Sequence, residues 1–168
     1  MRSRRPKPPL DPASPAAART VALRLLTVRA RGREDLGATL ARRGFERAAV
    51  AEALDRLARE GWLDDLAAAR SLVRARAARY GRARIARELS VLGFSKETVA
   101  AVFAEQEGEP EQTALARAFH LLWKRASGLD EPARRRRVRN ALARRGFASD
   151  AISAMMKGSD DEEEMDLR

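Results

Sequence analysis

Three stretches of this chain share one pattern, and the intervals between its positions are identical each time. Each stretch opens on an arginine, passes two apolar positions to a Gly-Phe pair, and closes on two more apolar positions. The three sets are Arg33, Leu36, Leu40, Gly44, Phe45, Val50 and Leu54; Arg82, Ile85, Leu89, Gly93, Phe94, Val99 and Phe103; and Arg135, Val138, Leu142, Gly146, Phe147, Ile152 and Met156. Self-similarity of this kind predicts one helical building block used three times, and it argues against a single catalytic pocket.

The Gly-Phe pair in each repeat is typical of a helix end. A glycine just beyond a helix often adopts the left-handed conformation, and the residue after it packs back on the last turn. With Gly44 in that role, Phe45 would pack on Leu40, and the same spacing holds in the other two repeats. Gly61 and Trp62 form a similar pair, a glycine followed by an aromatic residue that could pack back on the preceding helix. We therefore expect a helix to stop and a new one to begin at each pair.

Each repeat is preceded by a further amphipathic stretch, at about residues 16–31, 66–80 and 111–126. Every unit then has three helices, and no stretch shows the alternation of a strand. The sequence predicts an all-α protein in which three tandem three-helix modules stack into an elongated, curved array. The expected modules are residues 16–62, 63–108 and 109–157.

The two ends differ from the middle in composition. Residues 1–15 carry five prolines among basic residues, so we expect a disordered basic arm. Residues 158–168 are dense in acids, and we expect a disordered acidic tail. That tail could solubilise the protein, fold back on basic residues, or mimic a polyanion toward a partner.

The net charge is +10, from 34 basic and 24 acidic side chains. Without residues 159–168 the count is 33 basic and 18 acidic, or +15, so the central part is more basic than the total. Such a charge favours polyanions, meaning nucleic acid or an acidic protein surface. The alternative is that the charge serves solubility alone.

Catalytic and metal-binding patterns are absent from the sequence. It has no cysteine, and its single histidine, His120, lies in an apolar stretch between Phe119 and Leu121. The pair Asp64 and Asp65 is explained by helix capping. No Gly-Lys-Ser/Thr phosphate loop occurs, and no apolar run reaches the roughly 20 residues that cross a bilayer. We expect no catalytic residues, no metal, no cofactor and no membrane span.

The motifs, taken in order, resemble the RecX regulatory protein family over about residues 16–157. The most specific signal is a Gly-x-Leu-Asp-Asp run followed by an arginine-rich helix and then Gly-x-x-x-Ile-x-x-Glu-Leu. The residues that carry the resemblance are Leu40–Phe45, Leu54–Leu57, Gly61–Asp65, Arg70, Arg76, Tyr80, Gly81, Ile85, Glu88, Leu89, Gly93 and Phe94.

This resemblance implies a protein that is not an enzyme. It implies binding to the RecA recombinase, above all to its filament on single-stranded DNA. It also implies inhibition of ATP turnover, strand exchange and filament growth. We expect the protein to be cytoplasmic and monomeric.

From Leu66 to Arg87 the chain has no acid, and this segment is our candidate contact surface for an acidic partner. The predicted partner-binding residues are Arg70, Arg74, Arg76, Arg79, Tyr80, Arg82, Arg84 and Arg87. The alternative function is direct DNA binding without sequence preference by the same arginines, as weak binding to single or double strands. A second run, Arg134 to Arg137 with Arg139, is as dense, but its members point all around a helix.

Overall fold

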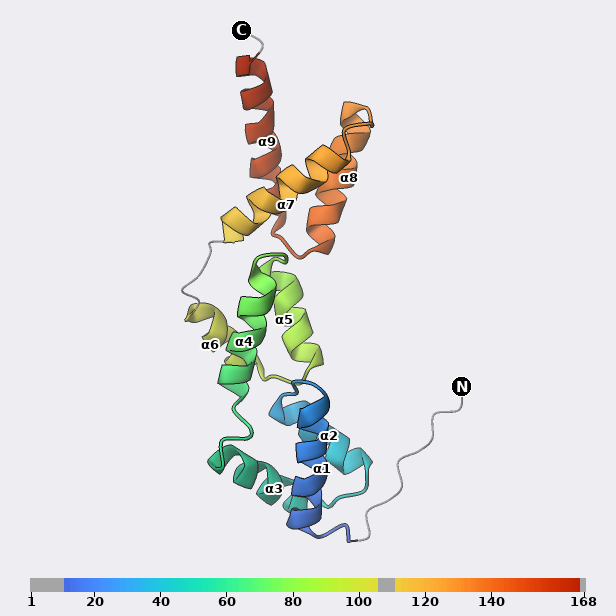
Figure 1. Cartoon of the computed structure of the whole chain (residues 1–168), viewed down its shortest axis with the longest axis vertical. Coiled ribbons are helices and arrows are strands. Elements are labelled where there is room, and N and C mark those ends of the chain that lie inside the picture. Colours follow the sequence, from blue (N-terminus) through green and yellow to red (C-terminus); the bar gives the residue numbers. More distant parts are fainter. Residues whose placement is uncertain (1–10, 106–110, 167–168) are drawn as a thin grey trace, which may run out of the picture. The chain divides into compact units, whose positions relative to one another are not determined.

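The computed structural model describes residues 11–105 and 111–166, with side chains up to Lys157. Within these residues the chain forms nine α-helices and no strand, so the predicted all-α class is confirmed (Figure 1). The helices are α1 (Pro15–Val28), α2 (Arg33–Arg42), α3 (Arg47–Arg59), α4 (Asp65–Ala77), α5 (Arg82–Val91), α6 (Lys96–Ala104), α7 (Glu111–Arg125), α8 (Glu131–Arg144) and α9 (Ser149–Asp166).

The predicted helix stops are confirmed at all three Gly-Phe pairs. Gly44 has a positive φ of 94°, and the N–H of Phe45 donates to the carbonyl of Leu40 at 3.2 Å. The equivalent bonds run from Phe94 to Leu89 and from Phe147 to Leu142. A left-handed residue without a Cβ turns the chain there, and the phenylalanine is buried each time.

Gly61 forms the same turn, but the side chain of the residue after it does not pack back on the preceding helix. The N–H of Trp62 donates to the carbonyl of Leu57 at 2.9 Å, as in the Gly-Phe pairs. Yet the Trp62 side chain is 63% exposed, and Leu63 is buried in its place. The expected packing of Trp62 is therefore wrong, because one further residue turns inward at this position.

Short polar side chains cap several helices at their starts. Ser14 accepts from the N–H of Ala17, Asp64 from that of Ala67, and Ser95 from that of Thr98. Asp64 thus supplies the predicted cap of α4.

Both ends of the described chain differ from our expected boundaries. The carbonyl of Pro12 accepts from the N–H of Glu46, and α1 begins at Pro15, so residues 11–15 do not belong to a disordered arm. At the other end α9 continues to Asp166, past residue 157 where we placed the end of the third module. Residues 1–10 and 106–110, with the predicted boundary at 108, lie outside the described residues.

The chain divides into two compact units. Among the described residues, the first comprises residues 11–71 and Leu89–Glu105, and the second comprises Leu72–Glu88 and residues 111–166. Helices α4 and α5 contribute residues to both units, so the second predicted module is divided between them. The module boundaries and the curved shape of the array stay predictions.

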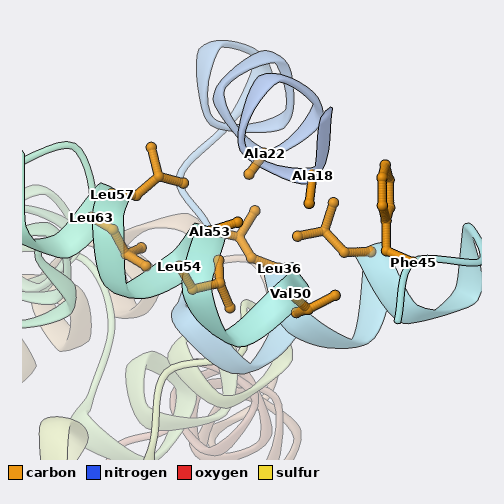
Figure 2. Packing of buried hydrophobic residues seen from close by; sticks show 10 residues of the cluster. Ala18, Ala22, Leu36, Phe45, Val50, Ala53, Leu54, Leu57 and Leu63 are labelled. Carbon is orange, nitrogen blue, oxygen red and sulfur yellow. The ribbon is translucent and has the colours of Figure 1, made fainter. Parts of the chain in front are cut away.

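The core of the first unit is built from α1 together with the repeat positions of α2 and α3. Ala18 and Ala22 of α1 face Leu36 of α2 and Ala53 of α3 (Figure 2). The small alanines allow α1 to approach closely, while leucines fill the space between α2 and α3. The buried cluster is Ala18, Ala22, Leu36, Leu40, Phe45, Val50, Ala53, Leu54, Leu57 and Leu63.

The second unit has an equivalent core between α7, α8 and α9. Phe119 of α7 packs with Val138 and Leu142 of α8 and with Ile152 of α9. The buried cluster is Ala114, Leu115, Ala118, Phe119, Ala126, Val138, Leu142, Phe147, Ile152 and Met156. The same repeat positions are therefore buried in the first and third repeats, as the pattern predicts.

Candidate interaction surface

The predicted contact residues lie on α4, on α5 and on the turn between these helices. Arg70 belongs to the first compact unit, whereas Arg74, Arg76, Arg79, Tyr80, Arg82, Arg84 and Arg87 belong to the second. Because the two units are described separately, only the second group is a local cluster. What each of these side chains already contacts decides whether it can serve a partner.

Two of the predicted arginines form ion pairs within the chain. Arg70 donates to the Glu105 carboxylate at 2.5 Å, and Arg76 donates to Glu88 of α5 at 3.2 Å. These bonds raise the pKa of Arg70 and of Arg76. Both are exposed ion pairs, a kind that contributes little to stability. In each pair, however, the guanidinium that we predict to contact a partner is already bonded to an acid of the same chain.

Arg84 lies between an aromatic ring and a helix end. Its guanidinium sits 4.4 Å from the centre of the Tyr80 ring, and its Nη1 donates to the carbonyl of Arg144 at 3.1 Å. That carbonyl belongs to the last turn of α8, where the helix dipole favours a cation. Tyr80, a predicted partner-binding residue, is half-exposed beneath Arg84.

The start of α5 docks against the end of α8 through two glycines. The N–H of Gly81 donates to the carbonyl of Arg145 at 2.9 Å. A Cβ added to Gly81 would lie 2.2 Å from the carbonyl oxygen of Gly146, which no side chain tolerates. The N–H of Arg82 donates to the Glu111 carboxylate at 3.0 Å, so an acid of α7 caps α5.

The first unit contains the same junction, 49 residues earlier along the repeat. The N–H of Gly32 donates to the carbonyl of Leu92 at 2.7 Å, and a Cβ on Gly32 would meet the oxygen of Gly93 at 2.1 Å. The N–H of Arg33 donates to both oxygens of Asp65, at 3.2 and 3.0 Å. An acid from the start of α4 thus caps α2, as Glu111 caps α5.

Asp65 carries out this capping in a partly buried position. Burial raises the pKa of its carboxyl above the ordinary value, while the hydrogen bond from the Arg33 N–H lowers it. The sequence analysis explains the Asp64-Asp65 pair as a cap of its own helix, α4, and does not predict that Asp65 caps α2. The signal that could have found it is the glycine directly before the repeated arginine, at Gly32 and Gly81.

Three of the predicted arginines remain available. The side chains of Arg74, Arg79 and Arg87 are exposed, and none forms a hydrogen bond or ion pair within the described part of the chain. All three belong to the second compact unit. We call them the α4–α5 free arginines.

Among the described residues no three histidines or acids gather as a metal site, and none of the described helices is long and apolar enough to span a bilayer. His120 is exposed, with its ring set edge-on to Phe119 at 5.6 Å between ring centres.

Three models of the RecX family match this chain in order. The first three-helix domain of the family matches residues 18–57, the second matches residues 64–102, and the third matches residues 110–156. Together they cover most of the chain and all three repeats, so the prediction of three three-helix modules is confirmed.

Curated relatives agree with this match. A regulatory protein RecX of Xanthomonas campestris pv. campestris (strain B100) is 40% identical over 135 residues, which are 78% of this chain and 80% of the relative. One of Stenotrophomonas maltophilia (strain R551-3) is 36% identical over 135 residues, with the same coverage of 78% and 80%.

Solved structures show the same fold. The crystal structure of RecX from Lactobacillus salivarius superposes with a TM-score of 0.72 and 18% identity, covering 87% of this chain and 96% of that one. A second crystal structure of a regulatory protein RecX gives 0.70 at 21% identity, covering 85% and 73%. By sequence and by fold, the chain belongs to the RecX family of regulatory proteins.

Proposed function

We propose that this protein binds the RecA recombinase and its filament on single-stranded DNA, and that it inhibits ATP turnover, strand exchange and filament growth. It does so as a cytoplasmic monomer without a cofactor or a catalytic activity of its own. The observation that carries this proposal is the match of all three repeats to the three domains of a regulatory family.

The contact surface falls on the α4–α5 free arginines. Arg70 and Arg76 form ion pairs with acids of this chain, and Arg84 donates to a carbonyl at the end of α8. The positive charges of these three arginines are therefore partly compensated within the chain. Arg74, Arg79 and Arg87 present unpaired guanidinium groups to solvent within the described residues. A guanidinium without an internal partner can bind an acidic surface without first breaking a hydrogen bond or ion pair within the chain.

A charge-reversed variant, Arg74→Glu with Arg79→Glu, tests this surface. We expect the protein concentration needed for half-maximal inhibition of filament ATP turnover to rise about tenfold, because like charges facing across an interface repel. Neither substitution removes an ion pair of the described chain, so helical content by circular dichroism should be unchanged.

The matched control is Arg24→Glu with Arg59→Glu. Both residues are exposed arginines of the first unit without a described partner, and Arg59, like Arg74, lies in the last turn of its helix. The control has the same net charge as the test variant and should inhibit like the unmodified protein. Equal inhibition by the two variants would show that the α4–α5 free arginines are not the contact surface.

A further inference from the structure

The last two turns of helix α9 are dense in acids. Six of the seven residues 160–166 are aspartate or glutamate, and the last turn of the helix holds no basic residue. We call residues 160–166 the acidic segment. Acidic residues at the C-terminal end of a helix are disfavoured by the helix dipole, and acids one turn apart repel each other. The sequence of α9 itself therefore offers nothing that compensates this charge.

A glycine separates the acidic segment from the packed part of α9. Ile152 and Met156 are buried in the core of the second unit, and Gly158 follows Met156 by two residues. Glycine weakens a helix interior, so a helix uncoils more readily there than at its neighbours. Because the core holds α9 only up to Met156, the acidic segment can leave the helix axis without disturbing that core.

Helix α8 and the packed part of α9 lie beside each other and run in opposite directions. A turn of four residues, 145–148, joins the end of α8 to the start of α9. Near the start of α8, the Nη1 of Arg135 donates to the carbonyl of Met156 at 3.5 Å. The acidic segment begins four residues after Met156, so it follows directly from the point where α9 meets an arginine-rich helix.

The contacts of α8 decide which of its arginines lie on the side of α9. The guanidinium of Arg134 lies 3.9 Å from the centre of the Trp123 ring, so that flank faces α7. Arg135 reaches α9 instead. At 3.6 residues per turn, Arg139 lies about 40° and Arg136 about 100° around the helix from Arg135, in the direction away from Arg134. These two arginines therefore occupy the flank of α8 next to α9.

We call Arg136 and Arg139 the α9-side arginines. Both are exposed, and neither forms a hydrogen bond or ion pair within the described chain. Helix α8 supplies no acid for them, because Glu131 accepts from Arg135 at 2.8 Å and the next acid along the chain is Asp150. Their charges are thus left without compensation by the helix that carries them.

The acidic segment is long enough to reach the α9-side arginines. Arg139 lies one turn, about 6 Å, along α8 from Arg135, whose guanidinium contacts α9 at Met156. An extended chain covers about 3.3 Å per residue, so the acidic segment spans roughly 23 Å when it is uncoiled. A chain that turns back at Gly158 therefore passes both arginines.

We propose that the acidic segment folds back at Gly158 and docks on the α9-side arginines, Arg136 and Arg139. Docking replaces a helix end that repels itself by ion pairs between unlike charges. The helical extension of α9 to Asp166 is then the undocked form. An outside polyanion must displace the acidic segment before it reaches these two arginines, so the contact is autoinhibitory. It goes beyond the function proposed above, because both parts belong to this chain.

A zero-length carbodiimide cross-link tests this contact in the full chain. In the variant Arg139→Lys the new amine keeps the positive charge, and the reagent joins it only to a carboxylate in direct contact. We expect mass spectrometry to find position 139 linked to the acidic segment at low salt. The link should be lost at about 1 M salt, where the screening length falls to about 3 Å.

The matched control is Arg137→Lys on the same helix. Arg137 is also exposed and without a described partner, but it lies on the far flank of α8, about 60° beyond Arg134. We expect about fivefold less cross-linked peptide at position 137, the population ratio that one exposed ion pair of good strength supports. Equal yields at the two positions would show that the acidic segment has no preferred flank. Either that result or the absence of a link at position 139 would overturn the proposal.

Neutralising part of the acidic segment tests whether it shields the arginines. The variant Glu162→Gln, Glu163→Gln, Glu164→Gln keeps the length of the segment and removes half of its charge. A neutral dicarbonyl reagent that modifies exposed guanidinium groups should then react several-fold faster with the α9-side arginines. Arg137 in the same sample should react as it does in the unmodified protein.

The control for this variant neutralises three exposed acids of the first unit that have no described side-chain partner: Glu34→Gln, Glu46→Gln and Glu52→Gln. It has the same net charge, and its α9-side arginines should react as in the unmodified protein. If the two variants accelerate the reaction equally, or if neither does, the acidic segment does not shield these arginines and the proposal is wrong. No recombinase is present in these measurements, so they are independent of the ATP-turnover test of Arg74 and Arg79.

Discussion

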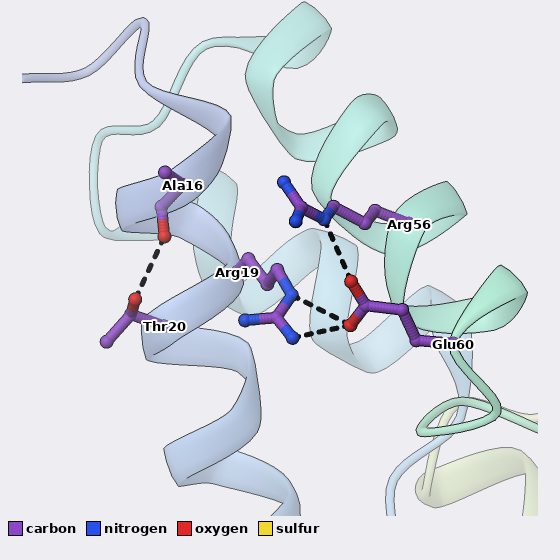
Figure 3. A network of polar contacts seen from close by, with 5 residues as sticks. All are labelled: Ala16, Arg19, Thr20, Arg56 and Glu60. Atoms are coloured by element: carbon purple, nitrogen blue, oxygen red, sulfur yellow. Dashed lines mark hydrogen bonds and ion pairs between the residues drawn. The ribbon is translucent and has the colours of Figure 1, made fainter.

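The carboxylate of Glu60 joins two helices of the first unit through two arginines. Arg19 of α1 donates to it at 2.5 Å and Arg56 of α3 at 2.8 Å (Figure 3). Arg56 is four residues from Glu60, a spacing that sequence can predict. Arg19 is 41 residues away, and no period of the sequence links the two. Local pairs of arginine and acid are therefore predictable, whereas Arg19–Glu60 and Arg70–Glu105 depend on the tertiary fold.

Neutralising Glu60 should change how stability depends on pH. The hydrogen bond from Arg19, followed by that from Arg56, lowers the pKa of Glu60 below its ordinary value of 4.5. An acid with a lowered folded pKa stabilises the fold above the unfolded value, and this contribution is lost as pH falls through the folded value. We expect Glu60→Gln to lower the melting temperature at neutral pH, with the difference from the unmodified protein shrinking in acid.

The control for this change is Glu52→Gln on the same helix. Glu52 is exposed and has no partner among the described residues. The melting temperature of the Glu52→Gln variant should equal that of the unmodified protein at every pH. A Glu60→Gln difference that is constant from neutral to acid pH would contradict the assigned role of the ion pair.

At the scale of elements, helix ends were predictable and helix junctions were not. The bond from Phe45 to Leu40 spans five residues, so a local pattern with glycine at a fixed place is sufficient to predict it. The contact of Gly32 with Gly93 joins residues far apart in sequence, and its cap comes from Asp65. The candidate arginines were found as a segment, but their pairing with acids depends on which helices pack together.

Replacing a junction glycine should loosen the second unit. In Gly81→Ala the new Cβ would meet the backbone oxygen of Gly146 at 2.2 Å, and backbone cannot move aside without cost. We expect the free energy of unfolding to fall by about 1–3 kcal/mol, as for other overpacked sites. Chemical denaturation followed by circular dichroism measures this.

The same change at Gly128 provides the comparison. A Cβ there meets nothing within 4 Å, and its loop belongs to the same unit. Gly128→Ala should be neutral or slightly stabilising, because alanine restricts the unfolded chain. If both variants unfold at the same denaturant concentration, the glycine junction does not hold α5 against α8.

For the whole molecule, exposed arginines without a described partner occur in both compact units, and two runs of them lie in the second. These runs are the α4–α5 free arginines and the exposed arginines of α8, although about 50 residues of sequence separate them. Such a unit would attract a polyanionic partner, as the proposed function requires. The repeat pattern predicts the all-α class and the number of modules, because each module buries its own stripe of apolar residues.

The proposed function requires that the protein recognise the recombinase filament rather than DNA alone. Its most direct test is retention of the full chain on immobilised single-stranded DNA, bare or coated with RecA, as salt rises. We predict that coated DNA retains the protein at salt concentrations that release it fully from bare DNA, because protein contacts add to phosphate contacts. Release from both at the same salt concentration would contradict the claim.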